Sequence, residues 1–303
     1  MTPIHKLHTN LNGNTFFVKR DDLLPFSFGG NKARKAVKFL EEIKKNNSDV
    51  IVTYGSSSSN HCRVTANMAA SENMRCVIIS PEEQYEQTSN SCMMELFGAE
   101  IVKAPLDRIS ETIDMVMDRL KETNNPYFIR GGGHGNIGTS AYVEAYKEIL
   151  EYEKDNKITF DYIFCASGTG TTQAGLVAGE ILEKRFEQKI VGISIARKNP
   201  YGGGVVLDSV KEYLGDTNDY SEKVLFTDKY ICGGYGKYND EILDTIRAVL
   251  VYDGMPLNTT YTGKAFWGMK KYVSDNVIKN KNILFVNTGG TPLFFDRLEN
   301  IAR

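Results

Sequence analysis

The strongest constraint on the fold of this chain is an alternation of short apolar runs with segments of helical periodicity. Residues 49–54, 75–80, 100–103 and 126–129 are short and rich in β-branched and aromatic side chains, which is typical of buried strands. Helical patterns separate them at 59–73, 90–97 and 109–122. Strands that alternate with helices predict βαβ units and a parallel sheet.

A second series of the same kind follows. A helix near Tyr142 precedes an expected strand at 162–166, and a glycine-rich turn leads from it into a helix at 173–184. Further strands are expected at 190–194 and 283–287. The strands therefore form two groups along the chain.

Two groups of strands in 303 residues predict two lobes, because one hydrophobic core stops growing near this length. We place a small α/β domain at 45–148 and build the large domain from 1–44 and 149–303. Proline-rich linkers, repeats and charged blocks are missing from the sequence, so the lobes are expected to share a tight interface with a cleft.

Composition and charge exclude several classes of partner. A net charge of -2 provides no broad basic field for nucleic acid or anionic membranes, which favours a small molecule as partner. No stretch approaches the roughly 20 apolar residues of a membrane span, and the first residues lack the apolar core of a signal peptide, so we expect a cytoplasmic protein. The five cysteines are scattered without a CxxC pair, which predicts neither disulfides nor a metal site.

A hydroxyl-rich glycine loop lies directly between an expected strand and an expected helix. Its residues are Ser167, Gly168, Thr169, Gly170, Thr171 and Thr172. Glycines let backbone amides approach an anion, and the helix N-terminus adds a favourable dipole. The loop matches neither the P-loop nor GxGxxG, so on its own it fits a phosphate cradle and a tight turn equally well.

Lys32 follows two glycines and Asn31 and begins a helical stretch at 33–44. A lysine at a helix start opposes the dipole, which disfavours its charge and suits an amine that must be neutral to attack an aldehyde. Taken alone, the lysine-rich stretch that begins at Lys32 fits a solvated basic helix face better than a cofactor site.

Seven segments, taken in order, resemble one enzyme family. They are Val18-Lys19-Arg20-Asp21-Asp22, the run from Gly29 to Lys35, Ser59-Asn60-His61, the loop from Ser167, Gly234-Tyr235-Gly236, Tyr261-Thr262-Gly263-Lys264-Ala265 and Asn287-Thr288-Gly289-Gly290. This order is similar to that of the 1-aminocyclopropane-1-carboxylate deaminase and D-cysteine desulfhydrase family. The resemblance implies a two-lobed, fold-type-II enzyme of the tryptophan synthase β-like class, with mainly parallel sheets and its active site in the interdomain cleft. It also implies pyridoxal 5'-phosphate as cofactor and a homodimer.

The resemblance also implies how the cofactor is held. Lys32 matches the Schiff-base lysine, and Lys35 matches a second lysine that reaches the cofactor phosphate beside the loop from Ser167 to Thr172. Asn60 matches the asparagine that hydrogen-bonds the pyridine hydroxyl. Thr288 falls where the pyridine nitrogen is met, and an uncharged partner there favours β-elimination and replacement over transamination.

Catalytic and substrate-binding roles are implied in the same way. Ser59, Tyr235 and Tyr261 match residues that act near the substrate, beside Lys32, which serves as the base for the Cα proton. The substrate-binding residues are expected to be Ser58, Ser59, Asn60 and His61, although His61 also fits simple packing at the helix start. His134, in a run of glycines, is ranked as incidental.

Two departures from the family pattern bear on the substrate. Thr262 stands where the ring-opening deaminases carry glutamate, and Ser58 replaces the usual glutamine. Thr262 favours α,β-elimination from a small amino acid with a β leaving group, of which D-cysteine is the type substrate, giving a keto acid and ammonia. The shorter Ser58 removes a side-chain contact and enlarges the pocket, which leaves a substrate other than D-cysteine open. Three alternatives remain open: 1-aminocyclopropane-1-carboxylate deamination, β-replacement as in cysteine synthase, and a cofactor- or amino-acid-binding protein without catalysis.

Overall fold

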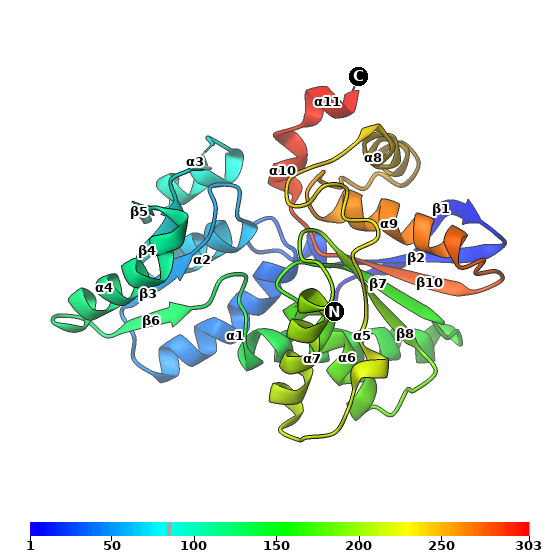
Figure 1. The fold of residues 1–303 in the computed structure, drawn as a ribbon, viewed down its shortest axis with the longest axis horizontal. Coiled ribbons are helices and arrows are strands. Elements are labelled where there is room, and N and C mark those ends of the chain that lie inside the picture. Colours follow the sequence, from blue (N-terminus) through cyan, green and yellow to red (C-terminus); the bar gives the residue numbers. More distant parts are fainter. Residues whose placement is uncertain (84–85, 303) are drawn as a thin grey trace. The chain divides into compact units, whose positions relative to one another are not determined.

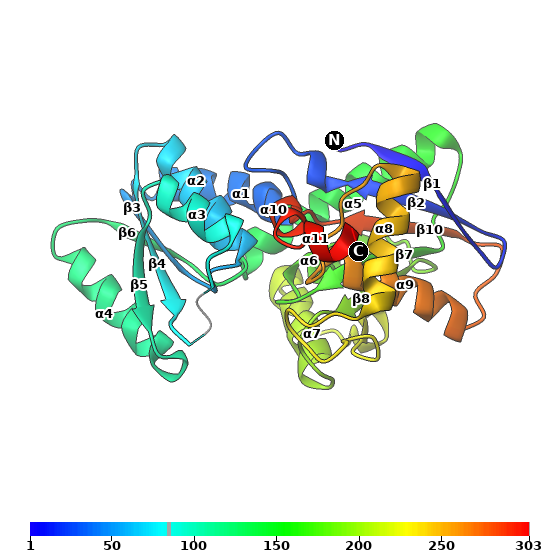
Figure 2. The ribbon, with the colours of Figure 1, turned by 90° about the horizontal axis from the view of Figure 1, so that it is seen from above.

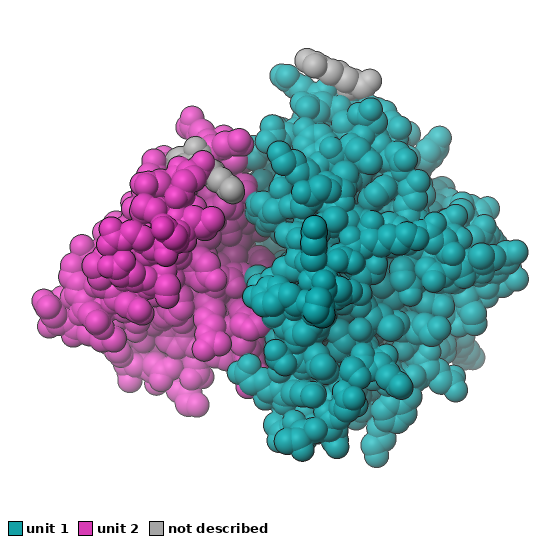
Figure 3. All heavy atoms as spheres, in the orientation of Figure 1, with its two compact units in different colours: residues 1–31, 138–303 teal, residues 32–137 magenta. Residues whose placement is uncertain are grey.

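The computed structural model describes residues 1–83 and 86–302. These residues form two compact units, coloured separately in Figure 3: unit 1 comprises 1–31 and 138–303, and unit 2 comprises 32–137. The sequence placed the division at 44/45 and 148/149 instead. The first difference arises because nearly the whole of helix α1, Asn31–Lys45, lies in unit 2.

Unit 2 is a parallel four-stranded sheet with helices on both faces. Its strands, in the order β5-β4-β3-β6, are Glu100–Ala104, Arg75–Pro81, Val50–Tyr54 and Pro126–Ile129. Figure 2 shows α4, Ile109–Lys121, on one side of the sheet, with α2, Asn60–Ser71, and α3, Ser89–Leu96, on the other. Val50 and Val52 of β3 pack with Val116 and Leu120 of α4, so alternate residues of the strand serve the two faces.

Unit 1 contains a six-stranded sheet in which one antiparallel pair extends a parallel core. The strand order is β1-β2-β10-β7-β8-β9. These strands span Ile4–Leu11, Asn14–Arg20, Asn282–Asn287, Tyr162–Ser167, Lys189–Ser194 and Leu225–Thr227. Only β1 and β2 pair antiparallel among the described residues, and the other neighbours run parallel.

Helices cover both faces of this sheet (Figure 1). They are α5 Asn136–Asn156, α6 Thr171–Leu182, α7 Tyr201–Leu214, α8 Asp240–Asp253, α9 Thr262–Asp275, α10 Thr291–Phe295 and α11 Leu298–Ala302. Phe164 and Phe285 face the core shared with α8 and α9, whereas their neighbours Ile163 and Leu284 face the core shared with α5, α6 and α7. A sheet buried on both faces reads as continuous apolar runs, as the sequence does.

All seven expected strands are present within one or two residues of their predicted ends, and the mixed α/β architecture with mainly parallel sheets is confirmed. The prediction missed β1, β2 and β9. Strand β2 ends in Lys19 and Arg20, two buried charges that pair with Glu148 and Asp22, so its sequence does not read as apolar. None of the helices in the described parts of the chain is long and apolar enough to cross a bilayer.

Candidate active site

Lys32 and Lys35 lie in the first turns of α1, and both approach the glycine run near residue 132. The Lys32 Nζ donates to the Gly132 carbonyl oxygen at 2.9 Å, and the Lys35 Nζ donates to the same oxygen at 3.3 Å. Gly132 and Gly133 have φ of 73° and 67°, which L side chains rarely adopt. No role was assigned to this run of glycines from its sequence, but its Gly132 carbonyl accepts hydrogen bonds from both lysines.

Burial lowers the pKa values of both lysine amines. It lowers the pKa of the Lys32 amine to about 8, an effect that neighbouring Cys62 partly opposes. It also holds the pKa of Lys35 well below its usual value, and the charge of Lys32 adds to this effect. Within residues 1–83 and 86–302, no carboxylate pairs with either amine, so the site favours an anionic ligand that supplies the missing negative charge.

The serine run before α2 is anchored by its own backbone and side chains. Ser59 caps α2 by accepting a hydrogen bond from the Cys62 amide at 3.2 Å, and the hydroxyls of Ser56 and Ser58 lie 3.2 Å apart. Asn60 is the first residue of the helix, half-buried, and its Oδ1 accepts a hydrogen bond from Asn90 at 2.9 Å. No motif in the sequence indicated Asn90, which lies 30 residues from Asn60 along the chain.

His61 is held inside unit 2 by Thr53. The Thr53 hydroxyl lies 2.8 Å from His61 Nε2 and donates its one hydrogen to the Ile129 carbonyl, also at 2.8 Å, so Nε2 must be the donor toward Thr53. Burial, aided by the charges of Lys32 and Lys35, keeps the His61 pKa well below its usual value, and the ring is neutral. This environment matches the packing interpretation of His61.

In unit 1, the loop from Ser167 to Thr172 connects β7 to α6. Gly170 takes a left-handed conformation at the start of α6, with φ of 90°, and among the described residues no side chain caps the helix. The Ser167 hydroxyl is buried without a hydrogen-bond partner in the described part of the chain. Uncapped amides at a helix start, beside an unsatisfied hydroxyl, form a site for an anion.

The turn after β10 lies at the same sheet edge, because β10 and β7 are parallel neighbours. Thr288 in this turn is buried, and its carbonyl accepts the Asn31 amide at 3.0 Å. The Asn31 side chain in turn donates to the Thr172 hydroxyl at 3.0 Å. The loop, the turn and the residue before Lys32 are thus joined by hydrogen bonds.

Tyr235 and Tyr261 lie side by side in unit 1. Their hydroxyl oxygens lie 2.7 Å apart, and the rings meet edge to face with centroids 5.8 Å apart. Asn258 Oδ1 accepts the Tyr261 amide at 2.7 Å, and the buried Lys264 donates to the carbonyl of Gly234, next to Tyr235. Asn258 lies outside the family segments, and Lys264 lies within one of them but was given no role from the sequence.

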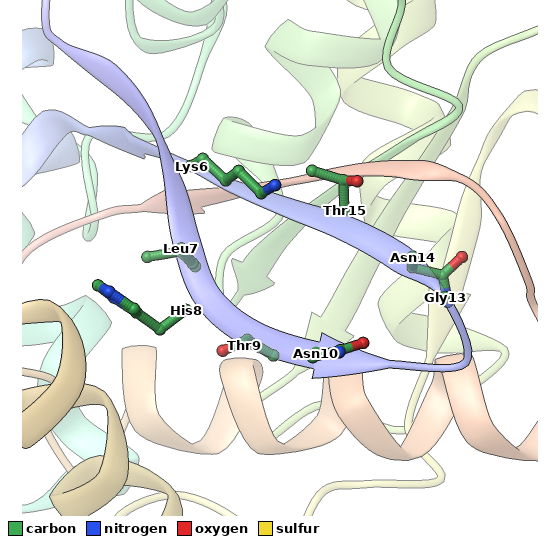
Figure 4. A pocket seen from close by; sticks show the side chains of 8 residues that line it. All are labelled: Lys6, Leu7, His8, Thr9, Asn10, Gly13, Asn14 and Thr15. Carbon is green, nitrogen blue, oxygen red and sulfur yellow. The ribbon is translucent and has the colours of Figure 1, made fainter.

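An open hollow of about 550 Å³ lies elsewhere, over the β1–β2 hairpin (Figure 4). Residues of β1, β2 and their turn line it, and the strand register shifts between Lys6 and Asn10. None of the residues proposed for the site lines this hollow.

These residues have the chemistry of an α/β enzyme class: unit 2 carries a lysine amine with a lowered pKa, and unit 1 carries an anion cradle at a helix start and a pair of tyrosine hydroxyls. Comparison with known proteins identifies the class more closely. Residues 1–289 match the family of pyridoxal-phosphate dependent enzymes. The chain belongs to this family.

Individual relatives cover almost the whole chain. D-cysteine desulfhydrase of Serratia proteamaculans is 30% identical over 313 residues, which include 97% of this chain and 92% of the relative. D-cysteine desulfhydrase of Yersinia enterocolitica is 30% identical over 309 residues, with the same coverage. A solved structure of an ACC deaminase homologue superposes with a TM-score of 0.88 at 30% identity and covers 99% of this chain and 93% of the homologue.

These comparisons confirm the predicted family, the fold type and the cofactor, pyridoxal 5'-phosphate. The described residues fit this group. Its aldehyde requires an amine that loses its proton readily, as Lys32 does, and its phosphate requires donors such as the uncapped start of α6 and the unsatisfied Ser167 hydroxyl.

Proposed function

We propose that this protein is a lyase that removes a β substituent from a small amino acid, with D-cysteine as the type substrate and pyruvate, ammonia and sulfide as products. The observation that carries the proposal is the Lys32 amine, whose pKa of about 8 lets it both bind the cofactor and serve as a base near neutral pH. The D-cysteine desulfhydrases aligned along 97% of the chain support this choice of substrate.

Each part of the candidate site has a role in this proposal. Lys32 would bind the cofactor covalently, Lys35 and the loop from Ser167 to Thr172 would hold its phosphate, and Thr288 would meet its ring nitrogen. Once bound, the cofactor withdraws electrons from the Cα of the substrate, which makes the Cα proton acidic. Lys32, released when the substrate amine takes its place, would then accept this proton at its Nζ, and the hydroxyl pair of Tyr235 and Tyr261 would donate a proton to the departing sulfur.

The serine run supplies the substrate contacts in the proposal. Ser58, Ser59, Asn60 and His61 flank the start of α2, where helix amides and hydroxyls suit a substrate carboxylate. We place Asn60 on the hydroxyl of the cofactor ring and His61 behind the site, because its Nε2 is already engaged by Thr53. We also propose that the enzyme acts as a homodimer in the cytoplasm, as family resemblance implies.

Ring opening is the second candidate, because the ACC deaminase homologue matches 99% of the chain at a TM-score of 0.88. The local structure at Thr262 favours elimination instead. Its hydroxyl accepts hydrogen bonds from the Asn258 amide and side chain, both at 3.0 Å, so this position serves to hold the start of α9. No carboxylate is available at this position for the chemistry of the ring-opening enzymes.

The proposal is tested by product analysis with the holoenzyme. D-cysteine is expected to give pyruvate, ammonia and sulfide in equal amounts, whereas ACC is expected to give no keto acid. Added thiol should leave the yield of pyruvate unchanged, because a replacement enzyme would instead form a thioether amino acid. Cofactor binding without keto acid from any D- or L-amino acid would contradict the lyase assignment and favour a binding protein.

Cofactor capture by the apoprotein is expected to depend on pH through Lys32. The free amine attacks and the ammonium does not, so a pKa of about 8 makes the neutral fraction rise about tenfold between pH 7 and pH 9. The initial rate of appearance of the visible band, followed by stopped flow, should rise with pH and level off above about pH 9. A rate that keeps rising toward pH 10.5 would show an ordinary, solvated lysine.

A further inference from the structure

Asn90, in the first turn of α3, is a buried polar residue outside all of the family motifs. Its side chain is 0% exposed and has three partners within unit 2. The Arg63 Nε donates to Asn90 Oδ1 at 2.8 Å, and Asn90 Nδ2 donates to the Ser58 carbonyl and to Asn60 Oδ1, both at 2.9 Å. One side chain therefore contacts two neighbouring residues of the proposed substrate and cofactor segment.

Donor and acceptor chemistry permits only this orientation of the two amides. The Arg63 Nε–H can only donate, so the atom of Asn90 that faces it must be the oxygen. The Ser58 carbonyl can only accept, which places the Asn90 nitrogen on the opposite side. The atom of Asn60 that faces this nitrogen must then be Oδ1, and the orientation of Asn60 follows from Arg63 through Asn90.

The Oδ1 of Asn60 therefore points toward Asn90, and its Nδ2 points away from Asn90. Within the described residues, Asn60 Nδ2 has no hydrogen-bond partner, and the side chain is half-buried. A donor in this position suits an electron-rich oxygen, whereas the flipped amide would turn a carbonyl oxygen toward it.

The support behind Asn90 is rigid. Thr88 caps α3 through a reciprocal pair of hydrogen bonds with Ser91, and its hydroxyl also donates to the Ser57 carbonyl at 2.9 Å. The start of α3 is therefore tied to the serine run at both Ser57 and Ser58. A fixed frame of this kind is needed if one amide is to orient another.

We propose that Asn90 is a positioning residue that orients the Asn60 carboxamide so that its Nδ2 donates to the ring oxygen of the cofactor. The inference rests on the proposed role of Asn60. Asn90 itself does not touch cofactor or substrate. It acts by excluding the flipped amide, in which the Nδ2 groups of Asn60 and Asn90, both donors, would face each other.

The Asn90→Asp variant tests this proposal with almost no change in shape. The carboxylate still accepts from Arg63, but it cannot donate, so Asn60 is expected to turn its Nδ2 toward residue 90 and its oxygen toward the cofactor. The dissociation constant for pyridoxal 5'-phosphate, measured by titrating the apoprotein, should rise about 10- to 100-fold. Asn73→Asp, an exposed change in the same unit, should leave it unchanged.

A double-mutant cycle separates positioning from a structural role. In an Asn60→Ala background, Asn90→Asp should change the dissociation constant by less than about threefold, because the amide through which it acts is gone. If Asn90→Asp weakens cofactor binding equally with Asn60 in place and in the Asn60→Ala background, the proposal is overturned. The loss would then come from the broken contact to Ser58 or from general disruption of the fold. If Asn90→Asp does not unfold cooperatively, Asn90→Ala replaces it in the same cycle with the same criterion.

The outcome also distinguishes failure of this inference from failure of the proposed function. If the unmodified apoprotein does not bind pyridoxal 5'-phosphate, the proposed function is wrong. If the unmodified apoprotein binds pyridoxal 5'-phosphate, and if Asn60→Ala weakens this binding while Asn90→Asp does not, then the function stands and the role proposed for Asn90 is wrong.

Discussion

Replacing Lys32 by alanine is expected to abolish the visible absorption band of the bound cofactor and to lower keto-acid formation by about 10³-fold or more. Two functions are lost together, because the same amine binds the cofactor and takes the Cα proton. Spectra recorded after adding pyridoxal 5'-phosphate to the purified apoprotein, and pyruvate formation from D-cysteine, measure the two losses.

Lys45→Ala is the matched control for this variant. Lys45 is an exposed lysine in the last turn of the same helix, and its loss should change neither the spectrum nor the rate. A band of normal intensity in Lys32→Ala would assign the cofactor to another lysine. The next candidates would be Lys35 and Lys264, both buried, with pKa values that burial lowers.

Replacing Gly30 by alanine is expected to destabilise the protein by on the order of 4 kcal/mol. Gly30 has φ of 91°, and an added Cβ would lie 2.5 Å from the Thr288 carbonyl oxygen and 3.2 Å from the Gly289 Cα. These are backbone atoms, so rotation of a side chain does not relieve the clash. The hydrogen bond from Asn31 to Thr288 should break, and cofactor affinity should fall with it.

Gly215→Ala separates the clash from the cost of the backbone conformation. Gly215 ends α7 with φ of 69°, and an added Cβ there meets nothing within 4 Å. This variant should lose only about 1 kcal/mol, the usual cost of the left-handed region for alanine. Urea unfolding of both apoproteins provides the comparison. Equal losses of unfolding free energy in the two variants would show that the close approach of Gly30 to Gly289 does not contribute to the cost.

The parts of the fold that were predicted are those encoded by local pattern. The runs that form β7 and β10 are largely apolar because these strands are buried on both faces. The glycines between β7 and α6 indicate a turn at that place. Strand β2 was not predicted, because the charge of its buried Lys19 is compensated by Glu148, 129 residues away. A pairing over this distance cannot be recognised from a short stretch of sequence.

The candidate site shows the same division. Lys32 and the tyrosines were proposed because their motifs resemble a family, and the loop from Ser167 because glycines and hydroxyls cluster there. Asn90 and Asn258 lie outside these segments and bind partners 30 or more residues away, so their sequence surroundings look ordinary. Lys264 lies within one of the segments, but its bond to the Gly234 carbonyl, 30 residues away, is not visible in the sequence. Supporting residues of this kind are visible only once the chain is folded.

The position of β10 in the large sheet has a consequence for how the protein is made. This strand, near the end of the chain, lies between β2 and β7, so the amino-terminal hairpin has no neighbour until residues 282–287 have been synthesised. All strands of the other sheet come from the continuous stretch 32–137, which is complete much earlier. Synthesis from the amino terminus therefore lets unit 2 fold first, while the apolar edge of β7 awaits its partner and is the part most exposed to misassembly on the ribosome.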